Sequence, residues 1–221
     1  TTVYRTIYDD TLMPPLRLWA GRDTPDYHSS AMARIATADG LLVGDVTGFW
    51  SPPVSLSRRY VVLRYRVSNV CSDTAITVVP AYFIDFDIGG DATTNFGDVM
   101  VDRDISYVSD NARQFMAGIK PLQDYSNLRS INNPALVWPQ SGLKDSEIYQ
   151  EVVAVENATG ATADDWSALA SFSPQTIAPG DTAVIWLAVL YSLSGESGLE
   201  ATDGSIIIPA DSGGVSTSLS E

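Results

Sequence analysis

The chain has 221 residues, of which 45% are hydrophobic, and this is enough to bury a substantial core in one large domain or two small ones. Its 27 acidic residues against 13 basic ones give a formal net charge of −14, so its own field repels nucleic-acid phosphates and anionic bilayers. We therefore expect no nucleic-acid partner. We also expect no membrane insertion, because apolar runs such as residues 182–191 are too short for a spanning helix.

Residue usage favours a loop-rich β protein. Aspartate outnumbers glutamate by 21 to 6, and only Lys120 and Lys144 are lysines, whereas helical proteins favour Glu and Lys. The single cysteine, Cys71, excludes an internal disulfide and a Cys-based zinc site. The chain opens on Thr1 without an initiator Met or a signal peptide, which fits a processed mature form, and we expect a secreted protein at the cell surface.

Strand patterns follow one another along the chain. Residues 40–50 predict an early strand, and residues 59–70 alternate apolar and polar side chains with the period of a half-buried strand. Residues 71–74 resemble a turn and residues 75–86 a returning strand, which predicts a hairpin with Pro80 at a bulge or an edge. Further strands are predicted at residues 104–109, 114–120, 182–193 and, near the end, 204–210.

Helix patterns are scarce. The best candidate is residues 162–170, where Thr162 can cap and Asp164 and Asp165 occupy a first turn that the helix dipole favours, and residues 145–153 are a weaker candidate. Many short strands between Gly, Pro and Asp turns predict a single all-β domain over residues 1–221, a two-sheet antiparallel β-sandwich, Ig-like or jelly-roll-like, with one or two short helices. The expected core positions include Val61, Leu63, Tyr65, Val67, Ile76, Val78, Ile185, Leu187 and Val189.

Two motifs carry a resemblance to a known family. Residues 83–89 read F-x-D-x-D-I-G, and residues 177–181, IAPGD, precede a hydrophobic strand. In this order the segments resemble a β-sandwich module of secreted prokaryotic surface proteins, over residues 58–200. Residues 1–57 then form N-terminal strands outside the module, and residues 201–221 a C-terminal strand and tail. The resemblance implies a structural or accessory extracellular role and no enzymatic activity.

The stretch from residue 83 to residue 104 contains six aspartates directly after an apolar strand. Ca²⁺ takes about six to eight oxygen ligands at roughly 2.3–2.6 Å, and a folded-back loop with Asn95 among its side chains supplies several. Gly89, Gly90 and Gly97 permit the positive φ angles of a tight ion-binding loop. The candidate metal ligands are Asp85, Asp87, Asp91, Asp98, Asp102 and Asp104.

This loop is not an EF-hand. Counted from Asp85, position five is Gly89 and position twelve is Phe96, where a bidentate Glu belongs. In a strand, Asp85 and Asp87 point to the same face, so their carboxylates repel each other unless a cation or hydrogen-bond donors compensate. We hypothesise a structural divalent cation, Ca²⁺ before others. The alternative is a solvated loop whose aspartates accept backbone N–H groups.

No catalytic arrangement stands out. His28, the single histidine, lacks a G-x-S-x-G context, Cys71 lacks a basic neighbour, and nothing among 27 acids selects one glycosidase pair. We therefore expect a non-enzymatic protein. Asn157 opens a glycosylation sequon, N-A-T. The tryptophans are expected mostly in the core, although they could form a platform for a polysaccharide, and they are Trp19, Trp50, Trp138, Trp166 and Trp186.

The functional expectation is a self-assembling subunit of an extracellular filament or surface layer. Residues 1–8 have strand-like composition and are followed by Pro14 and Pro15, so they form a detachable strand that could add to the sheet edge of a neighbouring copy. Residues 204–210 are a second candidate for such a strand. Two alternatives stay open, namely that both ends pair within their own sandwich, and that the chain is a carbohydrate- or ligand-binding accessory module of a secreted protein.

Overall fold

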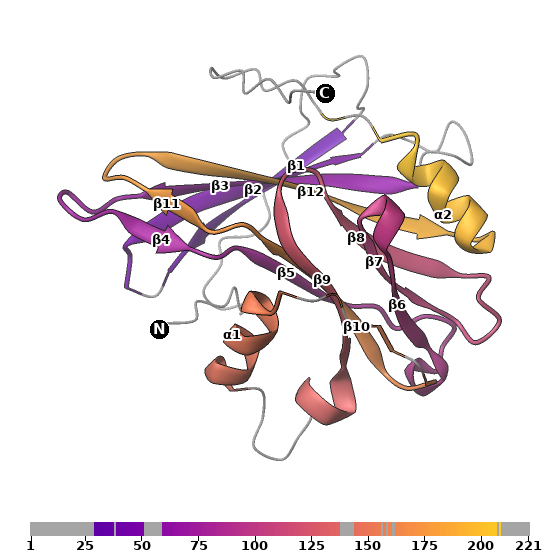
Figure 1. The fold of residues 1–221 in the computed structure, drawn as a ribbon. Helices are drawn as coiled ribbons and strands as arrows, with labels where there is room; N and C mark the ends of the chain where they lie inside the picture. The colour runs from indigo at the N-terminus through magenta and orange to yellow at the C-terminus, as the bar shows by residue number, and fades with distance from the viewer. Residues whose placement is uncertain are drawn as a thin grey trace.

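The computed structural model describes residues 29–37, 39–50, 59–137, 144–155, 157, 159–160, 162–206 and 208, and the side chains from residue 36 onward. The described chain is all-β, with two principal antiparallel sheets, a two-stranded ribbon and few helices (Figure 1). The expected β-sandwich class is therefore confirmed. The expectations for residues 1–8, His28, Trp19 and Trp138 fall outside the described residues.

The larger sheet has seven strands in the order β1-β2-β3-β12-β8-β7-β6. Their bounds are β1 Ser29–Ala36, β2 Leu42–Trp50, β3 Tyr60–Asn69, β12 Thr182–Ser192, β8 Met116–Pro121, β7 Ile105–Ser109 and β6 Phe96–Met100. At its centre β12 runs antiparallel to both β3 and β8, with Leu187 opposite Leu63 and Pro121. The strands expected at residues 40–50, 104–109, 114–120 and 182–193 are thus present.

The smaller sheet has three strands in the order β5-β10-β9, which are β5 Ala81–Asp85, β10 Trp166–Phe172 and β9 Tyr125–Asn132. The ribbon pairs β4 Ile76–Val78 with β11 Gln175–Ile177. Figure 1 shows the helix α1, Asp145–Val153, beside the smaller sheet and α2, Gly195–Asp203, beside β12 of the larger one. Short turns of 3-10 helix form η1 Ala92–Thr94 and η2 Val101–Arg103, and a π-helical turn forms η3 Asn133–Val137.

Apolar side chains fill both faces of the larger sheet. Between the two principal sheets, Ile119 and Leu128 are fully buried against Ala168 and Ala170 of β10. The opposite face of the larger sheet is covered by α2, whose Leu199 is fully buried in a second cluster. The second cluster comprises Tyr60, Val62, Ile105, Tyr107, Met116, Ala188, Leu190 and Leu199.

The expected core positions differ in how deeply they are buried. Ile185 and Leu187 are buried as expected, and the half-buried Leu63, Tyr65, Val67 and Val189 pack against them. In β3, however, the fully buried apolar residue is Val62, on the face beneath α2, because a sheet with both faces covered buries odd and even positions alike. The half-buried Ile76 and Val78 belong to the ribbon, outside both principal sheets.

The predicted hairpin of residues 59–86 is wrong. Strand β3 pairs with β2 and β12, whereas β4 pairs with β11 and β5 with β10. The fully buried Asn69 explains the departure, because its Nδ2 donates to the carbonyls of Thr74 at 2.8 Å and Ile177 at 2.9 Å. This side chain fixes the connection that carries the chain away from β3 into the ribbon.

Two further predictions near the C-terminal half are corrected. The predicted helix of residues 162–170 is instead the start of β10, in which every residue from Trp166 to Phe172 is buried. Its small Ala and Ser residues suit a central strand covered on both faces. The predicted strand of residues 204–210 is also wrong where the structure describes it, since Gly204 and Ser205 close the end of α2. The weaker helix candidate, residues 145–153, is α1.

Candidate functional site: an acidic cluster at the end of the smaller sheet

Three carboxylates meet at one end of the smaller sheet, and we call them the acidic cluster: Asp85, Asp87 and Asp165. One oxygen from each lies within 4.8 Å of the others. Asp85 is the last residue of β5, and Asp165 directly precedes β10. The antiparallel register, with Ser167 opposite Asp85, brings these two segments side by side. Asp85 and Asp87 are exposed and Asp165 is half-buried, so the oxygens are accessible from solvent.

A buried asparagine organises the cluster. Asn133 follows β9 and is fully buried, and its Nδ2 donates to Asp85 Oδ1 at 3.0 Å and to Asp165 Oδ1 at 2.7 Å. Its Oδ1 accepts from the hydroxyl of the buried Ser167 at 2.7 Å, and its backbone N–H donates to the Asp165 carbonyl at 2.9 Å. One side chain therefore links all three strands of the smaller sheet and orients two of the carboxylates.

Like charges leave this corner electrostatically unfavourable at neutral pH. Burial raises the pKa of Asp85, and the nearby Asp165 and Asp87 carboxylates raise it further, against the hydrogen bonds from Asn133 and Ser167, which lower it. No described Lys or Arg forms an ion pair with any of the three carboxylates. An oxygen-only set with excess negative charge is the chemistry that hard divalent cations take.

The other predicted ligands lie apart from the cluster and have local partners. Asp91 caps η1 by accepting from Thr93 N at 3.2 Å, and Asp98 in β6 accepts from Val99 N at 2.8 Å. Asp102 is exposed, with its carboxylate 3.9 Å from Arg103 Nε, and Asp104 accepts from Tyr125 Oη at 2.5 Å. The structure thus brings together two of the six predicted ligands.

The third member, Asp165, escaped the sequence analysis because residues 162–170 resembled a helix. Assigned as a strand, the D-D-W stretch would have placed a carboxylate at a strand start, where antiparallel pairing with β5 brings it beside Asp85. The sequence around Asn133 gave no indication that this residue would organise a site, since an N-N-P sequence indicates only a turn.

The remaining sequence candidates do not form a second centre in the described residues. Cys71 is half-buried, and Asn157 is exposed, with its Oδ1 accepting from Leu128 N at 2.9 Å. Trp166 is buried, and Trp186 is half-buried and stacked on Phe49 with ring centroids 6.0 Å apart. None of the helices that the structure describes has the length and apolar character needed to span a bilayer.

Comparison with known proteins gives only distant structural similarity. Neither a protein-family model nor a curated protein matches the sequence. The Slr1438 protein from Synechocystis sp. PCC 6803 superposes with a TM-score of 0.43 and 9% identity, over 81% of this chain and 66% of that one. A putative aldose 1-epimerase from Escherichia coli K12 gives 0.41 and 5%, over 78% and 67%. This chain spans about two thirds of each, and at these TM-scores neither similarity assigns it an activity.

Proposed function

We propose that this chain is a non-enzymatic structural module of a secreted prokaryotic surface protein, stabilised by a divalent cation, Ca²⁺ first, at the acidic cluster. The observation that carries the proposal is the meeting of Asp85 and Asp87 with Asp165, which comes from a separate segment, where the buried Asn133 holds Asp85 and Asp165 in place. A cation there joins the ends of β5 and β10 and neutralises mutually repelling carboxylates. Its role is to hold the fold, without turnover.

The energetic consequence of such binding follows from linkage. A ligand that binds only the folded state at about a hundredfold its Kd adds about 2.7 kcal/mol to the free energy of unfolding. For a chain of this size that corresponds to a rise in Tm of roughly 5–10 °C. Sodium ions at equal ionic strength screen the charges without bridging them, so they give a smaller rise.

The test compares melting temperatures in EDTA and in excess CaCl₂ for the intact chain and two variants. Asp87→Asn removes one cluster ligand and is expected to abolish the Ca²⁺-dependent rise, while its Tm in EDTA stays equal or increases because a repulsion is gone. Asp102→Asn is the matched control, since this aspartate comes from the same acidic stretch but lies outside the acidic cluster. Equal melting temperatures in EDTA and CaCl₂, with no heat of binding in calorimetry, would contradict the cation proposal.

We also propose that copies of this chain assemble by adding a strand to an open edge of a sheet. The outer edge of β6 is covered, because Gly160 N donates to Gly97 O at 2.8 Å and Asp164 N donates to Asn95 O at 3.0 Å. The outer edge of β9 receives Asn157. In the described ranges no strand pairs with the outer sides of β1 and β5, which leaves these two edges as acceptors for an added strand.

Residues 1–8 of a neighbouring copy are the proposed donor strand. Electron microscopy and light scattering of the intact chain are expected to show linear assemblies, and deletion of residues 1–12 is expected to leave monomers with an unchanged circular-dichroism spectrum. A synthetic peptide of residues 1–8 should shorten the assemblies by competition. Monodisperse monomers from the intact chain across salt and Ca²⁺ conditions, or filaments that survive the deletion, would contradict strand donation.

A further inference from the structure

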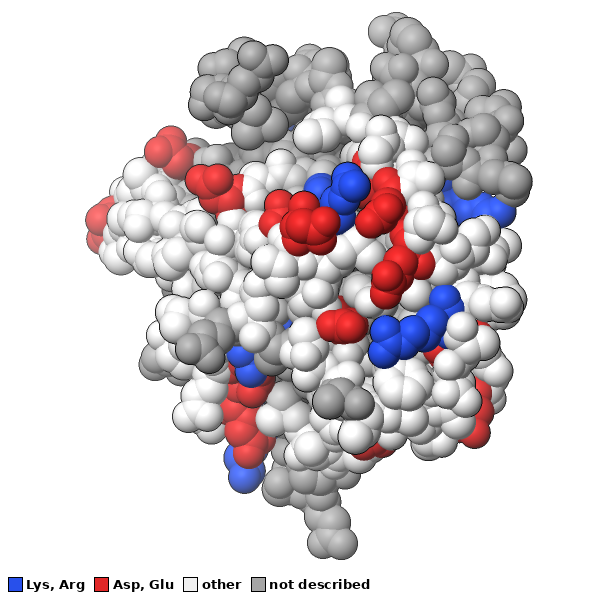
Figure 2. Space-filling model, turned by 45° about the vertical axis from the view of Figure 1, so that its right-hand side comes forward, with Lys and Arg blue, Asp and Glu red and all other residues white. Residues whose placement is uncertain are grey.

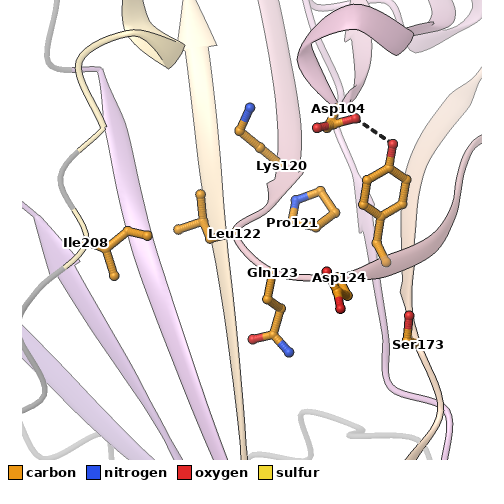
Figure 3. Close-up of a pocket in the computed structure, with 9 residues that line it drawn as sticks. Asp104, Lys120, Pro121, Leu122, Gln123, Asp124, Ser173 and Ile208 are labelled. Carbon is orange, nitrogen blue, oxygen red and sulfur yellow. Dashed lines mark hydrogen bonds between the residues drawn. The ribbon is translucent and has the colours of Figure 1, made fainter. Parts of the chain in front are cut away.

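A groove lies where the chain passes from β8 into β9, away from the acidic cluster (Figure 3). Its volume is about 580 Å³, within the range of roughly 300–1,000 Å³ that small-molecule sites occupy. Its lining consists of residues 120–125, at the end of β8 and the start of β9, together with Asp104, Ser173 and Ile208. The groove is open to solvent, so a ligand can enter without any movement of the described chain.

Several polar groups in the groove are held in place by the fold. Asp104 has a left-handed backbone, with φ 57°, and its carboxylate accepts from the Tyr125 hydroxyl at 2.5 Å. Gln123 Oε1 accepts from Trp186 N at 2.8 Å, which fixes the amide and leaves its NH₂ group to donate to another acceptor. Polar groups that are already held in place reduce the conformational entropy that the protein loses when a ligand binds.

The charge of the groove selects against anions. Lys120, the one basic side chain among the described lining residues, is already engaged, since its Nζ lies 3.0 Å from Asp203 Oδ1 and donates to the Arg103 carbonyl at 2.6 Å. The carboxylates of Asp104 and Asp124 therefore dominate the lining. A phosphate or carboxylate ligand would meet like charge without a free basic partner.

A polyhydroxylated ligand matches this lining in both hydrogen-bonding senses. Each hydroxyl group donates to a carboxylate such as Asp124 and accepts from an amide such as Gln123, and the Ser173 hydroxyl does either. The half-buried Leu122 and the exposed Ile208 provide apolar surface that suits the C–H face of a sugar ring, which water solvates poorly. No comparable match exists for a purely apolar molecule, because the exposed Asp124 would lose hydration without a partner.

We propose that this groove binds a neutral sugar residue, with Asp124, Gln123 and Ser173 as its hydrogen-bonding groups. Asp104 and Tyr125 act as positioning residues, since each holds the other in place. This site is independent of the cation and assembly proposed above, so either can fail without the other. A module with such a groove would attach its parent protein to a glycan.

The experiment is an NMR titration of the ¹⁵N-labelled full chain with D-glucose, D-galactose, D-mannose and N-acetylglucosamine at millimolar concentrations. At least one sugar is expected to shift the backbone amides of residues 122–125 and the side-chain amide of Gln123. Asp124→Ala and Ser173→Ala should each weaken the binding about tenfold, equivalent to about 1.4 kcal/mol, with the rest of the spectrum unchanged. Asp73→Ala, which removes an exposed carboxylate from the turn between β3 and β4, is the control and should bind normally.

Three outcomes would overturn the proposal. The first is the absence of shifts with every sugar, and the second is shifts confined to residues outside the groove. The third is a response to a diamine such as cadaverine with none to the sugars, which would identify the groove as an amine site that uses the same carboxylates. Because each variant spectrum also reports folding, a misfolded variant is recognised, and the other variant then decides.

Discussion

Asn133 offers the sharpest test of how the acidic end of the smaller sheet is held together. Replacing it with alanine removes two donors, to Asp85 at 3.0 Å and Asp165 at 2.7 Å, and one acceptor, for Ser167 at 2.7 Å. The backbone bond to the Asp165 carbonyl remains. The substitution therefore isolates the side-chain network from the strand pairing around it.

The expected loss of stability follows from burial. Asn133 and Ser167 are both fully buried, so the Ser167 hydroxyl loses its partner where water is absent, at a cost of about 1–3 kcal/mol. The two carboxylates are more accessible and recover hydration, so the loss of their hydrogen bonds adds only about 1 kcal/mol in total. The free energy of unfolding should fall by roughly 2–4 kcal/mol, and Tm by roughly 5–15 °C.

Urea denaturation followed by circular dichroism measures this change at constant m-value. Asn111→Ala is the matched control, because Asn111 lies exposed in the turn before β8 and its replacement should change the free energy by less than about 0.5 kcal/mol. A loss of less than about 1 kcal/mol for Asn133→Ala would refute the reasoning. It would mean that the network adds little beyond the strand pairing.

Three further substitutions test other parts of the molecule. Gly118→Ala places a Cβ 2.9 Å from Ile105 Cγ2 and should lower the free energy of unfolding by about 1–3 kcal/mol in urea denaturation, whereas an unchanged midpoint would show that β7 and β8 can separate slightly. Leu199→Ala empties a fully buried site under α2 and should cost about 2–5 kcal/mol by the same assay, and a cost below 1 would show that α2 is dispensable. Burial, and then the hydrogen bond and charge of Asp104, raise the pKa of Tyr125 to about 12. The contribution of neutral Tyr125 to the free energy of unfolding is therefore complete below pH 10 and is lost as the pH rises toward 12. Tyr125→Phe should therefore flatten this alkaline loss of stability and remove one late-ionising tyrosine from the absorbance titration, and an unchanged titration would place the raised pKa elsewhere.

The strands most clearly predicted from sequence are those with a strong periodic or apolar pattern. β12 at residues 182–192 was visible as a long apolar run after a Pro-Gly-Asp turn, and β3 as an alternating one. Periodicity reports which residues avoid water, but it does not report which strand lies alongside. β3 pairs with β2 and β12, and the chain leaves β3 for the ribbon through contacts such as that of Asn69 with Ile177, which is distant in sequence.

The errors around β10 and α2 have a common physical cause. β10 is rich in Ala and Ser, residues that strand propensity disfavours, and it is a strand because both its faces are covered by neighbours. α2 contains two glycines and only one fully buried leucine, so its local preference for helix is weak, and packing on β12 stabilises it. The wrong assignment of β10 also left Asp165 out of the predicted metal ligands, because Asp165 lies beside Asp85 only through the pairing of β10 with β5.

The net charge links the cation proposal to the assembly proposal. Figure 2 shows one face on which carboxylates occur in several separate groups, with fewer basic side chains between them. Copies that each carry a net charge of −14 repel one another over about 8 Å at physiological ionic strength, and a strand added at an edge must overcome this repulsion. Monovalent salt and Ca²⁺ both reduce the repulsion, but only Ca²⁺ bound at the acidic cluster does so at a saturable site.

If the cation serves assembly as well as folding, Asp87→Asn should raise the Ca²⁺ concentration needed for filaments and leave the effect of NaCl unchanged. If it serves folding alone, the variant should assemble at the same Ca²⁺ concentration as the intact chain whenever both are folded.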